Sequence, residues 1–118
     1  MERRDGILQL TLHTDGGPCV WGFGPHHEMT EALGEVGRDR ENKAVIITGA
    51  GDGFIPTIDW GNVGAGKVPP TAWAEVLFEG KHLIMNHLDI EVPMIAAVNG
   101  PARVHAELNR TTRDSYTA

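Results

Sequence analysis

Two short runs of apolar residues constrain the fold of this chain more than any other feature. Residues 44–47 and residues 92–98 are almost continuously apolar. Such runs are typical of strands that are covered on both faces of a parallel sheet, whereas a strand with one wet face alternates. A helical pattern lies between the two runs. Strand, loop, helix and strand together predict a parallel β-α-β crossover, which is right-handed in nearly all proteins, and an α/β fold class.

An alternating segment precedes the first apolar run. Residues 7–14 place Leu8, Leu10 and Leu12 on one face and polar side chains on the other. This period of two predicts a half-buried strand. A short second strand is indicated at residues 20–21.

Two helices are predicted. Residues 26–38 carry apolar side chains at i, i+3, i+4 and i+7, and Pro25 is placed as a start signal. The glycines and prolines of residues 61–70 indicate a loop, after which Thr71 is placed to cap a second helix that ends near residue 90. The apolar residues of this second helix fall on roughly one face: Trp73, Val76, Leu77, Leu83 and Ile84.

Charge and composition disfavour several partner classes. Ten basic and sixteen acidic residues give a formal net charge of −6. Nucleic acids and anionic membrane surfaces require clustered Lys and Arg, which this chain lacks. No run approaches the ~20 apolar residues of a membrane span. The lone Cys19 excludes an internal disulfide and is expected to be a small buried side chain, so a reducing, cytoplasmic compartment is expected.

Common cofactor and nucleophile motifs are absent from the sequence. The glycine-rich segment 49–53 does not match G-x-G-x-x-G, because that pattern would need glycine at Phe54. His82 and His87 are five residues apart, not the four that places two metal ligands on one helical face. The only serine, Ser115, does not lie in a G-x-S-x-G setting. We therefore expect neither a metal nor an organic cofactor.

Two segments resemble the crotonase (enoyl-CoA hydratase/isomerase) superfamily. Residues 44–54 read A-V-I-I-T-G-A-G-D-G-F and lead to Ile58 and Asp59, and residues 90–100 read I-E-V-P-M-I-A-A-V-N-G. They resemble the strand with its F-x-A-G-x-D loop and the K-P-x-I-A-A-V-N-G strand of that family. The resemblance runs over residues 1–108. It implies the N-terminal portion of a crotonase-like β-β-α spiral, a small-molecule substrate and a trimer-based homo-oligomer.

A finer resemblance points to the β-diketone hydrolases of the 6-oxocamphor hydrolase type. Trp21 is followed by His26, and residues 100–105 read G-P-A-R-V-H. In that branch the histidines matching His26 and His105 line the active site and contact the substrate carbonyls, with Trp21 as an apolar wall. An imidazole exchanges protons near neutral pH and hydrogen-bonds a carbonyl oxygen that gains charge. Asp59 is expected either to orient a substrate or a histidine, or to cap a helix.

The sequence departs from the ordinary hydratases at both backbone donors of their oxyanion hole. Pro56, expected near the rim of the site, has no N–H, and Val-His-Ala replaces the glycine triplet at residues 104–106. Residues 109–118 do not resemble the family and lack apolar periodicity, so they are expected to form a disordered tail. The acid/base pair of family members lies further downstream, so the chain is expected to be incomplete and to turn over β-diketones poorly.

The preferred hypothesis is hydrolytic C–C cleavage of a β-diketone, a retro-Claisen reaction, with His26 and His105 converging on one pocket. Two alternatives stay open. One is a hydratase or isomerase acting on an acyl-CoA. The other is a truncated, non-catalytic piece of an assembly, in which a partner covers an exposed apolar face.

Overall fold

The computed structural model describes residues 1–63, 66 and 68–103, together with the backbone of residues 115–117. The chain forms two compact units. The sheet unit comprises Met1–Val20, Arg40–Thr57 and Val92–Ala118, and the helix unit comprises Trp21–Asp39 and Ile58–Glu91.

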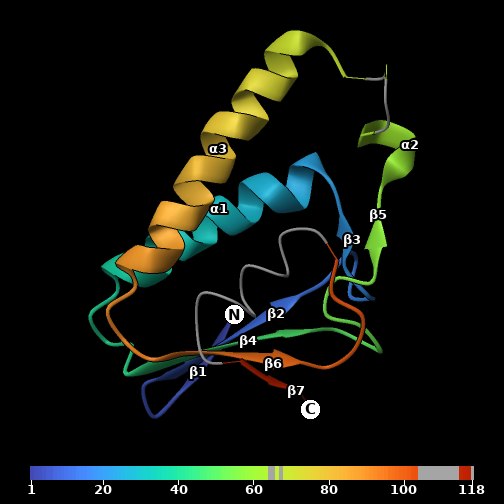
Figure 1. The fold of residues 1–118 in the computed structure, drawn as a ribbon. Coiled ribbons are helices and arrows are strands. Elements are labelled where there is room, and N and C mark those ends of the chain that lie inside the picture. Colours follow the sequence, from blue (N-terminus) through green and yellow to red (C-terminus); the bar gives the residue numbers. More distant parts are fainter. Residues whose placement is uncertain (64–65, 67, 104–114, 118) are drawn as a thin grey trace. The chain divides into compact units, whose positions relative to one another are not determined.

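The sheet unit is built on a five-stranded sheet in the order β1-β2-β4-β6-β7 (Figure 1). β2 pairs in parallel with β4, and β4 pairs in parallel with β6, whereas β1 is antiparallel to β2. The strands are β1 (Glu2–Arg4), β2 (Ile7–Leu12), β4 (Ala44–Gly49), β6 (Met94–Val98) and β7 (Ser115–Thr117). The α/β class and the parallel pairing of the two apolar runs are therefore confirmed.

A tight turn creates the antiparallel edge that the sequence pattern did not predict. Asp5 and Gly6 both have positive φ, 53° and 83°, which is the conformation of the two-residue hairpin turns that favour Asp-Gly. β1 therefore folds back along β2 and forms the edge of the sheet.

The buried face of the sheet carries one row of apolar residues per strand. Leu8 is paired with Val45, and Val45 with Met94, and all three are buried. The opposite face is only half-buried at Ile46, so the expectation that both faces of this strand are covered is wrong. The reason is that Ile46 is paired with exposed Gln9, which makes this face of the sheet partly polar.

The two segments that carry the family resemblance are joined by the side chain of Asn99. Its Oδ1 accepts the Gly49 N–H at 3.1 Å, and its Nδ2 donates to the carbonyls of Gly49 at 2.9 Å and Gly51 at 3.0 Å. The backbone N–H groups of Phe54 and Ile55 both donate to the Pro101 carbonyl at 3.1 Å. The glycine-rich loop is thus held against the segment that follows β6.

Residues 115–117 form β7, parallel to β6, where the sequence pattern predicted no strand. A strand on the edge of a sheet is held by backbone hydrogen bonds, so apolar periodicity is a poor guide to it. Residues 109–114 and 118 lie outside the described residues, and the division of the chain at residue 108 stays a prediction.

The helix unit contains α1 (Phe23–Arg38), α2 (Trp60–Val63) and α3 (Pro70–Asp89). A separate two-stranded sheet pairs β3 (Val20–Trp21) with β5 (Thr57–Ile58), which confirms the short strand predicted at residues 20–21.

Both long helices begin differently from the prediction. α1 begins three residues earlier than expected, at Phe23. α3 begins at Pro70 with Pro69 at the N-cap and no side-chain cap, so the capping role predicted for Thr71 is wrong. Proline at the first helical position has a fixed, helix-compatible φ and lacks an N–H that would have no partner there. The predicted loop is also wrong where α2 forms.

α1 and α3 lie side by side and run in the same direction (Figure 1). Contacts advance along both helices, from His26 with Glu79 to Gly37 with Ile90. The predicted single apolar face of α3 is wrong: Leu83 is 1% exposed, whereas Leu77 on the same helix is 73% exposed. In the part of the chain that the structure describes, no helix combines the length and apolar character needed to cross a membrane.

Candidate active site

His26 is the one predicted catalytic residue that the structure describes in detail. It lies in the first turn of α1 and is 3% exposed. Its Nδ1 lies 3.1 Å from Oε2 of Glu79 on α3. The ring of Trp21 meets the imidazole edge-on, with centroids 5.9 Å apart and an interplanar angle of 73°. Trp21 is buried and forms an apolar wall beside His26.

Glu79 binds a second histidine with its other oxygen. Oε1 lies 2.6 Å from Nδ1 of His27, whose side chain is 60% exposed. The hydrogen bond and charge of Glu79 raise the pKa of His27 above its ordinary 6.5. The same hydrogen bond is the largest cause that lowers the pKa of Glu79 below its ordinary 4.5. The carboxylate therefore stays ionised near neutral pH while it contacts both imidazoles.

The glycine in the middle of α3 lies beside the imidazole of His26. A Cβ added at Gly80 would lie 3.6 Å from Nε2 of His26. Glycine is unfavourable in a helix interior by roughly 1 kcal/mol relative to alanine. Gly80 thus lies where α3 passes close to the imidazole of His26, a position that the sequence pattern alone did not indicate.

Asp59 lies in the same unit as His26, but its carboxylate caps α2. Its Oδ1 accepts the Asn62 N–H at 3.3 Å, and its Oδ2 accepts the Asn62 amide at 2.7 Å. Its own N–H donates to the Trp21 carbonyl at 2.8 Å. Asp59 thus caps a helix, which is one of its two predicted roles. Its other predicted role, to orient a substrate or a histidine, stays a prediction.

The other two predicted site residues lie outside the helix unit as the structure describes it. Pro56 belongs to the sheet unit, where its carbonyl accepts the Arg103 Nε–H at 2.9 Å. His105 lies outside the described residues. The convergence of the two histidines on one pocket therefore stays a prediction.

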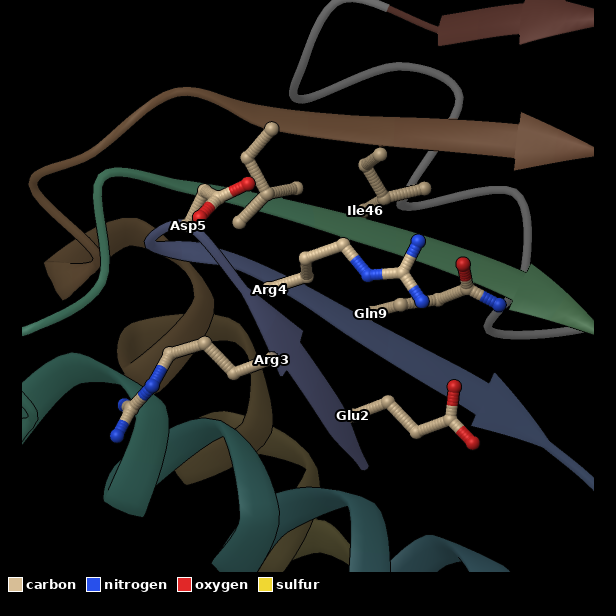
Figure 2. Close-up of a pocket in the computed structure, with 7 residues that line it drawn as sticks. Glu2, Arg3, Arg4, Asp5, Gln9 and Ile46 are labelled. Carbon is tan, nitrogen blue, oxygen red and sulfur yellow. The ribbon is translucent and has the colours of Figure 1, made fainter.

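Each unit has a surface cavity. In the helix unit, a groove of about 560 Å³ lies along α1 and α3, and its lining includes His27, Glu79 and His82. In the sheet unit, a cavity of about 750 Å³ is lined by charged residues of β1 and by Gln9 and Ile46; Figure 2 shows Arg4 extended over the sheet towards Gln9 and Ile46. None of the predicted site residues is among the residues that line these two cavities; Glu79, the partner of His26, lines the first.

The described residues contain no group of three or more His, Cys, Asp or Glu side chains placed to hold a metal ion. Cys19 is buried, as predicted. His26 itself offers the chemistry of an imidazole with a carboxylate partner: proton exchange and hydrogen bonding.

Glu79 is the site residue that sequence reasoning missed. A signal for it was present, because Glu79, Leu83 and His87 are spaced i, i+4, i+8, and Leu83 and His87 are both buried. Residues at that spacing share one face of a helix. The spacing places Glu79 on the same face of α3 as Leu83 and His87, but it does not indicate which histidine the acid contacts.

Sequence and structure comparisons link the chain to larger enzymes. It is 34% identical over 106 residues to a probable enoyl-CoA hydratase of Mycobacterium tuberculosis, with 84% of this chain and 36% of that protein covered. A β-diketone hydrolase from the cyanobacterium Anabaena, solved with (S)-3-oxocyclohexyl acetic acid, is 40% identical with a TM-score of 0.81. That match covers 91% of this chain and 42% of the hydrolase.

A putative enoyl-CoA hydratase from Streptomyces coelicolor also has a TM-score of 0.81, and at 22% identity it supports the fold alone. It covers 96% of this chain and 42% of that enzyme. The chain thus spans less than half the length of these relatives. No protein-family model matches the chain.

Proposed function

We propose, on the premise that the chain belongs to the crotonase (enoyl-CoA hydratase/isomerase) superfamily, that it supplies the carbonyl-binding histidine of a β-diketone hydrolase. The observation that carries the proposal is the buried imidazole of His26, held between the Glu79 carboxylate and the Trp21 ring. The 40% identity to the Anabaena β-diketone hydrolase supports the same branch.

The proposed reaction is a hydrolytic retro-Claisen cleavage. Water adds to one carbonyl of the diketone, and the bond from that carbon to the central carbon breaks. Its electron pair passes to the second carbonyl, which becomes an enolate, and a proton on the central carbon then restores the ketone. The products are a carboxylic acid and a ketone, joined in one molecule when the diketone is cyclic.

His26 acts on the enolate oxygen in this scheme. An N–H of the imidazole donates a hydrogen bond to that oxygen, and the bond strengthens as negative charge develops. Trp21 keeps water away from one side of the ring, which favours electrostatic interactions there. The second histidine of the proposed site is His105, and the proposed oligomer is built on trimers, as the family resemblance implies.

An acyl-CoA hydratase or isomerase is the second candidate, favoured by the 34% identity to the mycobacterial enzyme. Pro56 argues against it, because proline removes the backbone N–H that the thioester oxyanion of ordinary hydratases would use at this position. In the described loop, the Ile55 N–H is already donated to the Pro101 carbonyl.

A competition experiment tests the proposal. The purified chain is titrated with a cyclic 1,3-diketone and, separately, with an enoyl-CoA, and binding is measured by calorimetry. We expect the diketone to bind in preference, and His26→Ala to weaken its binding about tenfold, as for loss of one hydrogen bond to a charged oxygen. Preferred binding of the enoyl-CoA, no diketone binding, or equal binding by His26→Ala would each contradict the proposal.

A further inference from the structure

We propose that Glu79 is a positioning residue for His26: it holds the Nδ1 proton, which assigns the chemistry of the ring to Nε2. What Nε2 does to a substrate rests on the proposed function. The protonation of Nδ1 does not.

The Nδ1 assignment follows from the chemistry of the carboxylate. An ionised carboxylate only accepts hydrogen bonds, so the atom that faces it at 3.1 Å must carry a proton. Nδ1 of His26 is therefore an N–H donor. In the neutral ring, the tautomer is set by the hydrogen bond that one nitrogen makes, so Nε2 is then the basic nitrogen. In the protonated ring, Nε2 is a donor as well.

Glu79 is itself anchored from a second side. His27 Nδ1 contacts Oε1 at 2.6 Å, so the carboxylate bridges two consecutive residues of α1. The side chain of Glu79 is only 27% exposed, whereas that of His27 is 60% exposed. Oε2 of Glu79 contacts the buried His26, and the contact of Oε1 with the exposed His27 holds the carboxylate in place.

Gly80 is next to Glu79 in sequence and faces the other ring nitrogen. An alanine Cβ there would lie 3.6 Å from Nε2, which is ordinary van der Waals contact. A methyl group therefore fits without displacing the ring, whose Nε2 is itself buried. Gly80→Ala is thus a mild change next to Glu79 that leaves the contact between Glu79 and Nδ1 intact.

Nitrogen NMR of the full 118-residue chain, labelled with ¹⁵N-histidine, tests the inference directly. Histidine ring nitrogens report which of the two carries the proton, and His26→Gln identifies the signals of His26. We expect wild-type His26 to show a protonated Nδ1. Glu79→Ala should remove this signature and give a mixture of tautomers, while Glu79→Asp should restore it in part.

Two matched variants keep the outcome interpretable. His27→Ala removes the other partner of Glu79 and should leave Nδ1 of His26 protonated. Gly80→Ala places a methyl group beside the ring without a clash and should also leave the tautomer unchanged. A wild-type ring with its proton on Nε2 alone, or an unchanged ring in folded Glu79→Ala, would overturn the positioning role.

The two proposals fail in different ways. If no diketone binds but the Nδ1 signature depends on Glu79, the proposed function is wrong and the positioning role stands. If the diketone binds through His26 but the signature ignores Glu79, the function stands and the positioning role is wrong.

Discussion

Both units of the molecule bury apolar residues, but only the helix unit also buries histidines among the described residues. The strands of the sheet unit bury apolar side chains in register, as in the row of Leu8, Val45 and Met94. The helix unit buries His26 and His87 while α3 leaves Leu77 largely exposed. A buried polar side chain needs a hydrogen-bond partner, and an exposed apolar side chain adds little stability. Buried histidines beside an exposed leucine are therefore not what stability alone would favour. This difference is the reason that we propose a site in the helix unit.

The two faces of α3 offer the largest contrast to test. Leu83→Ala removes a fully buried side chain and should cost about 2–5 kcal/mol of unfolding free energy. Leu77→Ala on the exposed face should change it by less than about 0.5 kcal/mol. Urea unfolding followed by circular dichroism measures both. Similar costs for the two variants would show that the exposed face is covered in solution, which would favour the assembly alternative.

In the sheet unit, Asn99 is a polar exception to the apolar pattern. Asn99→Ala removes three side-chain hydrogen bonds to the glycine-rich loop and should cost about 1–3 kcal/mol. Gln9→Ala is the control, because Gln9 is exposed and makes one long contact of 3.4 Å to Thr11. Hydrogen exchange should show faster exchange in the loop of Asn99→Ala only. An unchanged loop would mean that the backbone hydrogen bonds of Phe54 and Ile55 to Pro101 are enough to hold it.

The smallest expected effect is on the pH dependence of stability, through the contact between Glu79 and the exposed His27. The lowered pKa of Glu79 stabilises the fold above pH 4.5, and this is lost as pH falls through the lowered value. The raised pKa of His27 stabilises the fold below pH 6.5, and this is lost as pH rises through the raised value. The contribution is therefore complete between pH 4.5 and 6.5.

His27→Ala should accordingly lower the urea midpoint most within that window, and the difference from wild type should shrink at higher pH. Glu28 and Glu31 also raise the pKa of His27, so Glu31→Gln is a useful control that should reproduce only a minor part of the effect. A constant difference at all pH values would mean that the lost contact is not ionic.

The sheet was largely predictable from the sequence, because apolar runs and alternation report burial directly. The apolar runs at residues 44–47 and 92–98 predict neighbouring parallel strands, and the structure has them so. The edge strands β1 and β7 were not predicted. They are held by backbone pairing and, for β1, by the turn at Asp5 and Gly6. Backbone pairing leaves little trace in side-chain patterns.

The site was only partly predictable. His26 and Trp21 were identified through resemblance, and the structure places their rings in contact. Glu79 was missed because it lies 53 residues from His26, and only the packing of α1 on α3 brings them together. The capping interpretation of Asp59 depended on α2, a four-residue helix inside a predicted loop. Local patterns do not encode such distant contacts.

The most direct test of the account is a crystal structure of the chain with a cyclic β-diketone in its enol form. The account predicts a ligand oxygen within hydrogen-bond distance of Nε2 of His26, beside Gly80, with the ligand ring against Trp21. A ligand seated instead in the sheet-unit cavity beside Arg4 and Gln9 (Figure 2), with His26 untouched, would contradict it.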